Sequence, residues 1–158
     1  MEPEGTPSGA TKLTRWLTPP ELRAWRGFVL NARDVLNDIE TDLRRFGIDG
    51  GDYQLLEMLS EASDHRVRLC DLATTLRLSR SGLTRRLEGV LTKGFVHRVR
   101  DDDDGRSAYA ELTAKGWRML KRAAPVHVAS VRERVIDRLS KEELATLASA
   151  FEKLGLNR

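Results

Sequence analysis

Apolar residues recur every three or four positions between residues 22 and 46, the period of one face of an α-helix. The stripe comprises Leu22, Trp25, Val29, Ala32, Leu36, Ile39, Leu43 and Phe46. Thr18, two prolines and Glu21 precede it, as is typical of a helix start, and Gly47 ends it. We predict a helix over 18–46. Because such a long seam exceeds what a small domain needs for its own core, part of it is expected to face a second subunit.

Three shorter apolar stripes follow. Asp52 is placed to cap one helix, and another is expected to begin near Asp71. Ser79 is placed to cap a third helix, which Gly94 closes and whose buried stripe is Leu83, Leu87, Val90 and Leu91. Only residues 77–78 separate the last two helices. Two short helices joined by so tight a link indicate a helix-turn-helix.

Two strand-like runs, residues 95–100 and 108–112, flank the acidic segment RDDDDGRS of residues 100–107. An Asp-Gly pair between such runs favours a β-hairpin, because glycine tolerates the positive φ of tight turns. Thr113 can then cap a long helix in which Pro125 is a possible kink, and Ser140 with Glu143 forms a capping box for a last helix ending at Gly155. The fold class expected is mainly α with a small β-hairpin wing (α+β), in one domain over 18–158 after a disordered tail over 1–17.

The composition, 40% hydrophobic and 32% charged, is that of a folded chain. No apolar run reaches the roughly 20 residues that cross a bilayer, and the first residues lack a signal peptide's apolar centre, so a cytoplasmic location is expected. The net charge of +3 is uneven: residues 77–100 hold seven basic residues against one acidic, leaving −3 for the remainder. Such a patch attracts nucleic acid, although charge alone is equally compatible with a solvated helical face.

The helix that Ser79 caps carries its polar residues away from its apolar stripe. Ser79 and Arg80 lie in its first turn, and Ser81, Thr84, Arg85 and Glu88 follow on the outer face. A helix N-terminus suits phosphate, and arginine can bind guanine in the major groove, but an ordinary amphipathic helix would look the same. The neighbouring hairpin favours DNA binding. Arg106 near its tip could enter a minor groove, with Asp104 holding a guanidinium of Arg106, Arg85 or Arg86.

Other chemistry finds less support in the sequence. Residues 100–111 partly match the spacing of an EF-hand calcium loop, but Arg100 stands where an acid belongs and the flanks are strand-like. The single cysteine, Cys70, is expected to be buried and inert, and its pairing with His65 is a weak basis for a metal site. We find no paired nucleophile and base and no glycine-rich phosphate loop, so neither an enzyme nor a cofactor or metal is expected.

The segment from Leu78 to Gly116 resembles the MarR family of bacterial transcription regulators. The resemblance rests on Leu78-Ser79, Leu83-Thr84-Arg85, Gly94, Asp104-Gly105-Arg106, Leu112-Thr113 and Gly116. It implies a winged helix-turn-helix over 52–112, with 18–46 and 113–156 as dimerisation helices of an obligate homodimer. It also implies that Thr84, Arg85 and Arg106 contact a pseudo-palindromic double-stranded DNA, with Ser79, Arg80 and Ser81 beside them.

Many MarR-like proteins release DNA when a small, often phenolic, ligand binds. The resemblance therefore implies a repressor with a small-molecule effector, whose pocket residues the sequence does not identify. Trp16 and Trp25 are aromatic candidates, but Trp25 lies on the apolar seam, which favours core or dimer interface over ligand contact. The alternative is a DNA-binding regulator without an effector, controlled by its abundance or by a protein partner.

Overall fold

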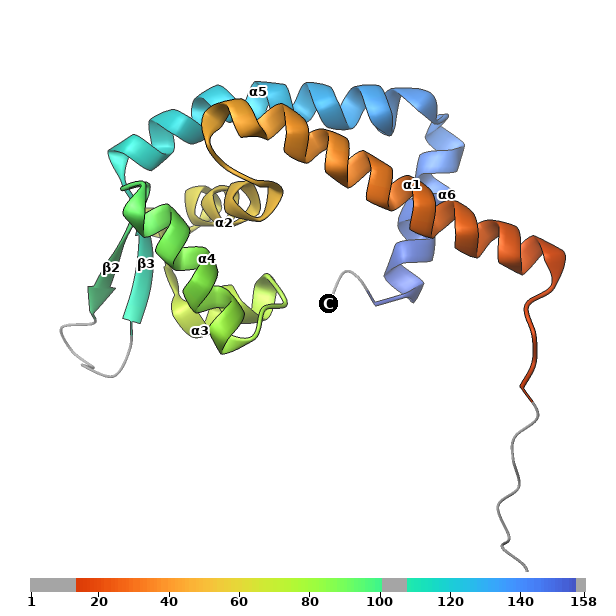
Figure 1. Cartoon of the computed structure of the whole chain (residues 1–158), viewed down its shortest axis with the longest axis horizontal. Coiled ribbons are helices and arrows are strands. Elements are labelled where there is room, and N and C mark those ends of the chain that lie inside the picture. Colours follow the sequence, from red (N-terminus) through yellow and green to blue (C-terminus); the bar gives the residue numbers. More distant parts are fainter. Residues whose placement is uncertain (1–13, 101–107, 156–158) are drawn as a thin grey trace, which may run out of the picture. The chain divides into compact units, whose positions relative to one another are not determined.

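The computed structural model describes residues 14–100 and 108–155. The chain forms two compact units, residues 1–33 and 34–158. The helices are α1 (Pro19–Leu43), α2 (Gly50–Glu61), α3 (Leu69–Thr75), α4 (Arg80–Thr92), α5 (Ala114–Arg134) and α6 (Lys141–Lys153), and the strands are β1 (Arg66–Arg68), β2 (Val96–Arg100) and β3 (Ala108–Leu112) (Figure 1). The expected fold class, mainly α with a small antiparallel sheet, is confirmed. No helix of the described ranges has both the length and the apolarity to cross a membrane.

Helix α1 begins as its sequence predicts. The amide and hydroxyl of Thr18 both donate to the Glu21 carboxylate, at 2.7 and 2.9 Å. The helix ends at Leu43, and a 3-10 turn over Arg44–Phe46 completes the predicted segment before Gly47 at φ 70°. Trp25 is 56% exposed, so it does not belong to the core of this chain. Of the tail expected over 1–17, residues 1–13 lie outside the described residues.

The cap of α2 differs from the predicted one. Asp49, not Asp52, is the N-cap: its carboxylate accepts the amide of Asp52 at 2.7 Å. Both aspartates precede the same apolar stripe, and the helix begins one turn earlier than expected, at Gly50. Asp52 is therefore inside the first turn, where its carboxylate is available to another element.

The three strands form an antiparallel sheet in the order β1-β3-β2. The two predicted strands are confirmed: β2 pairs with β3 from Val96 opposite Leu112 to Arg100 opposite Ala108. The third strand, β1, was not predicted, and it pairs with the other edge of β3. One face of the sheet contributes Val96, Ala110 and Leu112 to the core, which also includes Leu55, Leu56, Leu59, Leu72, Leu87 and Val90.

Helix α5 starts close to the beginning of β2. Its N-cap Thr113 accepts the amide of Gly116 at 3.0 Å, as predicted. A Cβ on Gly116 would lie 2.2 Å from the carbonyl oxygen of Phe95, so this close approach requires glycine. Pro125 lies within α5, which continues past it to Arg134. The predicted capping box of Ser140 and Glu143 opens α6.

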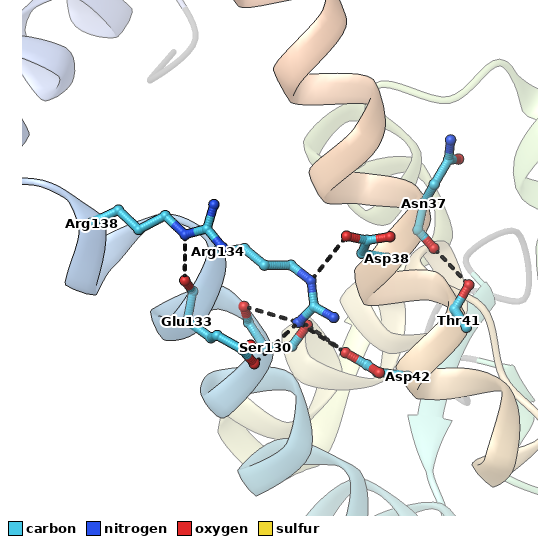
Figure 2. Close-up of polar contacts among 8 residues, drawn as sticks. All are labelled: Asn37, Asp38, Thr41, Asp42, Ser130, Glu133, Arg134 and Arg138. Atoms are coloured by element: carbon cyan, nitrogen blue, oxygen red, sulfur yellow. Dashed lines mark hydrogen bonds and ion pairs between the residues drawn. The ribbon is translucent and has the colours of Figure 1, made fainter.

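A polar cluster joins the C-terminal half of α1 to the end of α5 (Figure 2). Arg134 contacts Asp38 through Nε at 3.2 Å and Asp42 through Nη1 at 3.1 Å. Buried Ser130 donates to Asp42 at 2.8 Å and accepts from Arg134 at 2.8 Å. Charge-assisted bonds of this kind are shorter and stronger than neutral ones, so the cluster fixes the spacing of the two helices at this point.

Candidate nucleic-acid interface

Helix α4 presents a polar surface on the side opposite to its buried stripe. Ser79 caps it by accepting the amide of Gly82 at 3.1 Å, as predicted. Leu83, Leu87 and Val90 are buried. The predicted site residues on the other side are all exposed: Ser79, Arg80, Ser81, Thr84 and Arg85. The structure therefore brings five of the seven predicted residues together on one accessible helix face.

Hydrogen bonds orient the hydroxyl groups of this face. Thr84 donates to the carbonyl oxygen of Arg80 at 3.0 Å, and the hydroxyls of Ser79 and Ser81 lie 3.1 Å apart. The first turn of a helix has partial positive charge because its amides point outward. Arg80 and Arg85 add formal charge, so the face is suited to a polyanion.

A hollow of about 550 Å³ lies between α3, the first turns of α4 and the sheet. Its polar lining includes Arg68, Arg80, Thr84 and Arg98. Cys70 also lines it and is exposed, so the expectation of a buried cysteine was wrong. The reason is that α3 starts at Leu69, which places Cys70 in its outward-facing first turn rather than ahead of the helix.

Ion pairs hold the inner side of α4 against the start of α2, and no local sequence pattern indicated them. Arg86 on α4 binds both Asp49 and Asp52, with Nη1 3.0 Å from the Asp52 carboxylate. The other oxygen of Asp52 binds Lys93 at 2.9 Å, near the end of α4. Asp52 is only 5% exposed. One buried carboxylate thus ties α4 to α2 at two points, about two turns apart.

The same contacts settle the protonation of the pair. Partial burial acts to raise the pKa of Asp49, but the bonds from Arg86 and from the Asp52 amide outweigh it and lower that pKa. The bond to Asp49 raises the pKa of Arg86. Both groups are therefore charged at neutral pH. Arg86 was one suggested partner of Asp104; among the described residues, its carboxylate partners include Asp49 and Asp52, while Asp104 lies outside the described residues.

Gly51 makes room for this arginine. A Cβ built on Gly51 would lie 2.5 Å from Nη2 and 2.6 Å from Cζ of Arg86. The guanidinium group lies directly against the backbone of the first turn of α2, where any side chain would displace it. The position of the Arg86 guanidinium therefore depends on a glycine that carries no signal of its own in the sequence.

A second polar pair, buried Tyr53 and half-buried His127, lies between α2 and α5. The rings of Tyr53 and His127 lie 4.1 Å apart, centre to centre. Burial raises the pKa of Tyr53 to about 12. Burial also lowers the pKa of His127, against the opposing effect of Glu57, and its Nδ1 has no hydrogen-bond partner in the described part of the chain. Both side chains are therefore neutral at pH 7.

Two predicted site residues, Asp104 and Arg106, lie in 101–107, outside the described residues. The segments that flank them are strands, unlike the helices that flank an EF-hand loop. His65 approaches the carbonyl oxygen of Ser60 through Nδ1 at 3.0 Å and packs on Trp117. Among residues 14–100 and 108–155, no three His, Cys, Asp or Glu side chains gather as metal ligands would.

A tight two-helix unit followed by a hairpin is the architecture of a winged helix-turn-helix protein. The model of the MarR family matches residues 51–108, from the start of α2 to the start of β3. The transcriptional repressor YetL of Bacillus subtilis is 30% identical over 114 residues, which cover 70% of this chain and 68% of YetL. The chain belongs to the MarR family and is a DNA-binding transcriptional regulator rather than an enzyme.

Solved structures agree in both sequence and fold. AbsC, a MarR family transcriptional regulator from Streptomyces coelicolor, is 37% identical with a TM-score of 0.88, covering 90% of this chain and 96% of AbsC. Sco3205, a MarR family regulator from the same organism solved in complex with DNA, is 32% identical with a TM-score of 0.87, covering 90% of each chain.

Proposed function

We propose that this protein is a homodimeric repressor that binds a pseudo-palindromic DNA operator and releases it when a small, phenolic ligand binds. The observation that carries the proposal is the accessible polar and basic face of α4, on a helix whose other side is fixed to α2 by a buried carboxylate. A recognition helix must be rigid relative to its domain, because base contacts discriminate only when the side chains are held in register.

We assign the DNA contacts by position on α4. Thr84 and Arg85 read base edges in the major groove, and Ser79, Arg80 and Ser81 bind phosphates or neighbouring bases around the helix start. Arg106 enters the adjacent minor groove with support from Asp104. The solved DNA complex of the 32% identical Sco3205 supports DNA as the ligand of this fold, and the repressor YetL supports the direction of regulation.

Dimerisation would bury the apolar surface that the single chain exposes. Among residues 14–33, the described part of the first unit, the large exposed apolar side chains are Trp16, Leu17, Trp25, Phe28, Val29 and Leu30. So much exposed apolar surface on α1 and the residues just before it is typical of an interface. We assign residues 18–46 and 113–156 to this role, with the winged helix-turn-helix over 52–112 reading one half-site in each subunit.

The test is fluorescence anisotropy with the intergenic duplex beside the protein's own gene and with a scrambled duplex. We expect Arg85→Ala to reduce the preference for the intergenic duplex, because it removes a base contact worth about 1–3 kcal/mol. Arg122→Ala, on the exposed surface of α5, is the matched control, provided that size-exclusion chromatography shows an unchanged oligomeric state. Equal effects of the two variants would contradict the assignment of α4. Asp104→Asn should weaken binding if the carboxylate supports Arg106, and strengthen it if the carboxylate only repels phosphate.

A thermal-shift screen of phenolic and other aromatic acids tests the effector. A ligand that binds only the folded dimer raises the Tm. At a concentration of one hundred times its Kd, it adds about 2.7 kcal/mol to the free energy of unfolding. The same ligand should lower the affinity for the operator. If compounds that raise the Tm leave DNA binding unchanged, the alternative of a regulator controlled by abundance or by a protein partner is favoured.

A further inference from the structure

We propose that Arg68, held in place by Tyr109, is an additional contact to the DNA phosphate backbone beside the α4 face. The proposal rests on the proposed DNA-binding function and adds a residue outside the helix-turn-helix and the wing tip. Arg68 ends the short strand β1, which the sequence did not predict, so its position became apparent only in the structure.

The strand register places three side chains on one outer face of the sheet. Arg68 stands opposite Tyr109 on β3, and Arg66 is two residues away on the same face. Arg68 donates from Nε to the Tyr109 hydroxyl at 2.8 Å. Arg66 lies over the Tyr109 ring, with Cζ 4.1 Å from the ring centre. One tyrosine therefore orients two guanidinium groups, one through its hydroxyl and one through its ring.

Arg68 ends the edge strand β1, directly before the start of α3. It lines the same hollow as Arg80 and Thr84 of the first turns of α4 and Arg98 of β2. Tyr109 is the second residue of β3, so the pair lies at the end of the sheet where β2 ends and β3 begins (Figure 1). A duplex that contacts the α4 face would pass this corner, where Arg68, Arg80 and Arg98 surround the hollow.

The chemistry of the pair suits a phosphate. The bond to Tyr109 uses Nε, one of the five N–H donors of a guanidinium. Arginine typically binds phosphate through two parallel N–H donors. A preoriented arginine loses less side-chain entropy when it binds, which improves affinity without new contacts. Arg66 is the weaker candidate, because Glu111 stands directly opposite it in the β1–β3 register.

The experiment measures the salt dependence of DNA binding for Arg68→Gln, with Arg122→Gln as the matched charge control after size-exclusion chromatography has shown that both variants keep the oligomeric state of the wild type. Loss of one phosphate contact should reduce the slope of log K against log salt by about 0.9. The affinity should fall roughly five- to tenfold on the operator and the scrambled duplex alike, because phosphates carry no sequence information. Tyr109→Phe keeps Arg68 and its charge, so it should lower affinity less and leave the slope unchanged.

If Arg68→Gln changes slope and affinity no more than Arg122→Gln, Arg68 only fastens β1 to β3 and the proposal is overturned. The Tm of each variant is measured first. If Arg68→Gln is not folded, Arg68→Lys is measured in its place. Lysine keeps the charge, so the slope of log K against log salt should not change, and a decrease of about 0.9 in that slope would also overturn the proposal. If the wild-type protein does not distinguish the two duplexes, the proposed function fails, while the slopes on the scrambled duplex still decide the role of Arg68.

Discussion

Asp52→Asn is the sharpest test of how α4 is held, because it changes one atom type at a buried position. Asp52 accepts from Arg86 at 3.0 Å through one oxygen and from Lys93 at 2.9 Å through the other. Asparagine has nearly the same shape, but it carries no charge and presents one amide group where a carboxylate oxygen stood. One of the two cations must therefore lose its acceptor.

The magnitude follows from the exposure of the partners. Removing one member of a fully buried ion pair costs about 3–5 kcal/mol. Here the side chains of Arg86 and Lys93 are 29% and 36% exposed, so water compensates part of the loss, and Arg86 keeps Asp49. We expect the free energy of unfolding to fall by about 1–3 kcal/mol, discounted for this solvent screening. For a chain of this length that is a decrease in Tm of about 3–10 °C.

Thermal and urea denaturation measure this loss, with Glu88→Gln on the exposed face of α4 as a control for charge. DNA affinity distinguishes two effects of the substitution that have opposite signs. Removing a negative charge near a polyanion should strengthen binding, whereas loosening α4 should weaken specific binding. We expect specific affinity to fall. If Asp52→Asn unfolds at the same midpoint as Glu88→Gln and binds the operator more tightly, the ion pairs do not position α4.

Three further predictions concern the scaffold. Gly116→Ala should lower the free energy of unfolding by about 2–3 kcal/mol, because its Cβ would meet the Phe95 carbonyl oxygen at 2.2 Å; an unchanged urea midpoint would contradict this contact. Because burial holds the pKa of His127 below its usual 6.5, its contribution to stability is present above pH 6.5 and lost as the pH falls through the lowered value. His127→Gln should therefore flatten the loss of stability between pH 7 and 5, and an identical pH profile would refute the role of this histidine. Arg134→Met should cost about 1–2 kcal/mol at low salt and less at 1 M salt, since two α1 carboxylates lose their cation; a salt-independent loss in Tm would indicate a packing effect instead.

Local signals in the sequence predicted the elements that depend on near neighbours. The caps Ser79, Thr113 and Ser140 bond to amides three residues ahead, and each helix begins where its cap predicts. The same locality explains the error at α2, where two aspartates three residues apart compete for one role. The strand β1 has only three residues, and its partners on β3 are about 40 residues away, so no periodicity could reveal it.

The candidate site also has a part that local sequence patterns could predict and a part that they could not. The outer face of α4 could be predicted from its apolar stripe, and the structure confirms that Ser79, Arg80, Ser81, Thr84 and Arg85 are exposed, while their contacts to DNA stay a prediction. The ion pairs of Arg86 join residues more than 30 positions apart, and the exposure of Cys70 depends on where α3 begins. These features arise from tertiary packing, which a single sequence does not encode in any short pattern.

The contact between Gly51 and Arg86 has an evolutionary consequence. Since a Cβ at position 51 would occupy the place of the guanidinium, substitution of the glycine first would displace Arg86, and loss of the arginine first would leave Asp52 with one cation fewer. The two positions should therefore change together across the family. Relatives with a side chain at the position of Gly51 should lack a long basic residue at the position of Arg86 and should hold the helix that corresponds to α4 by other contacts.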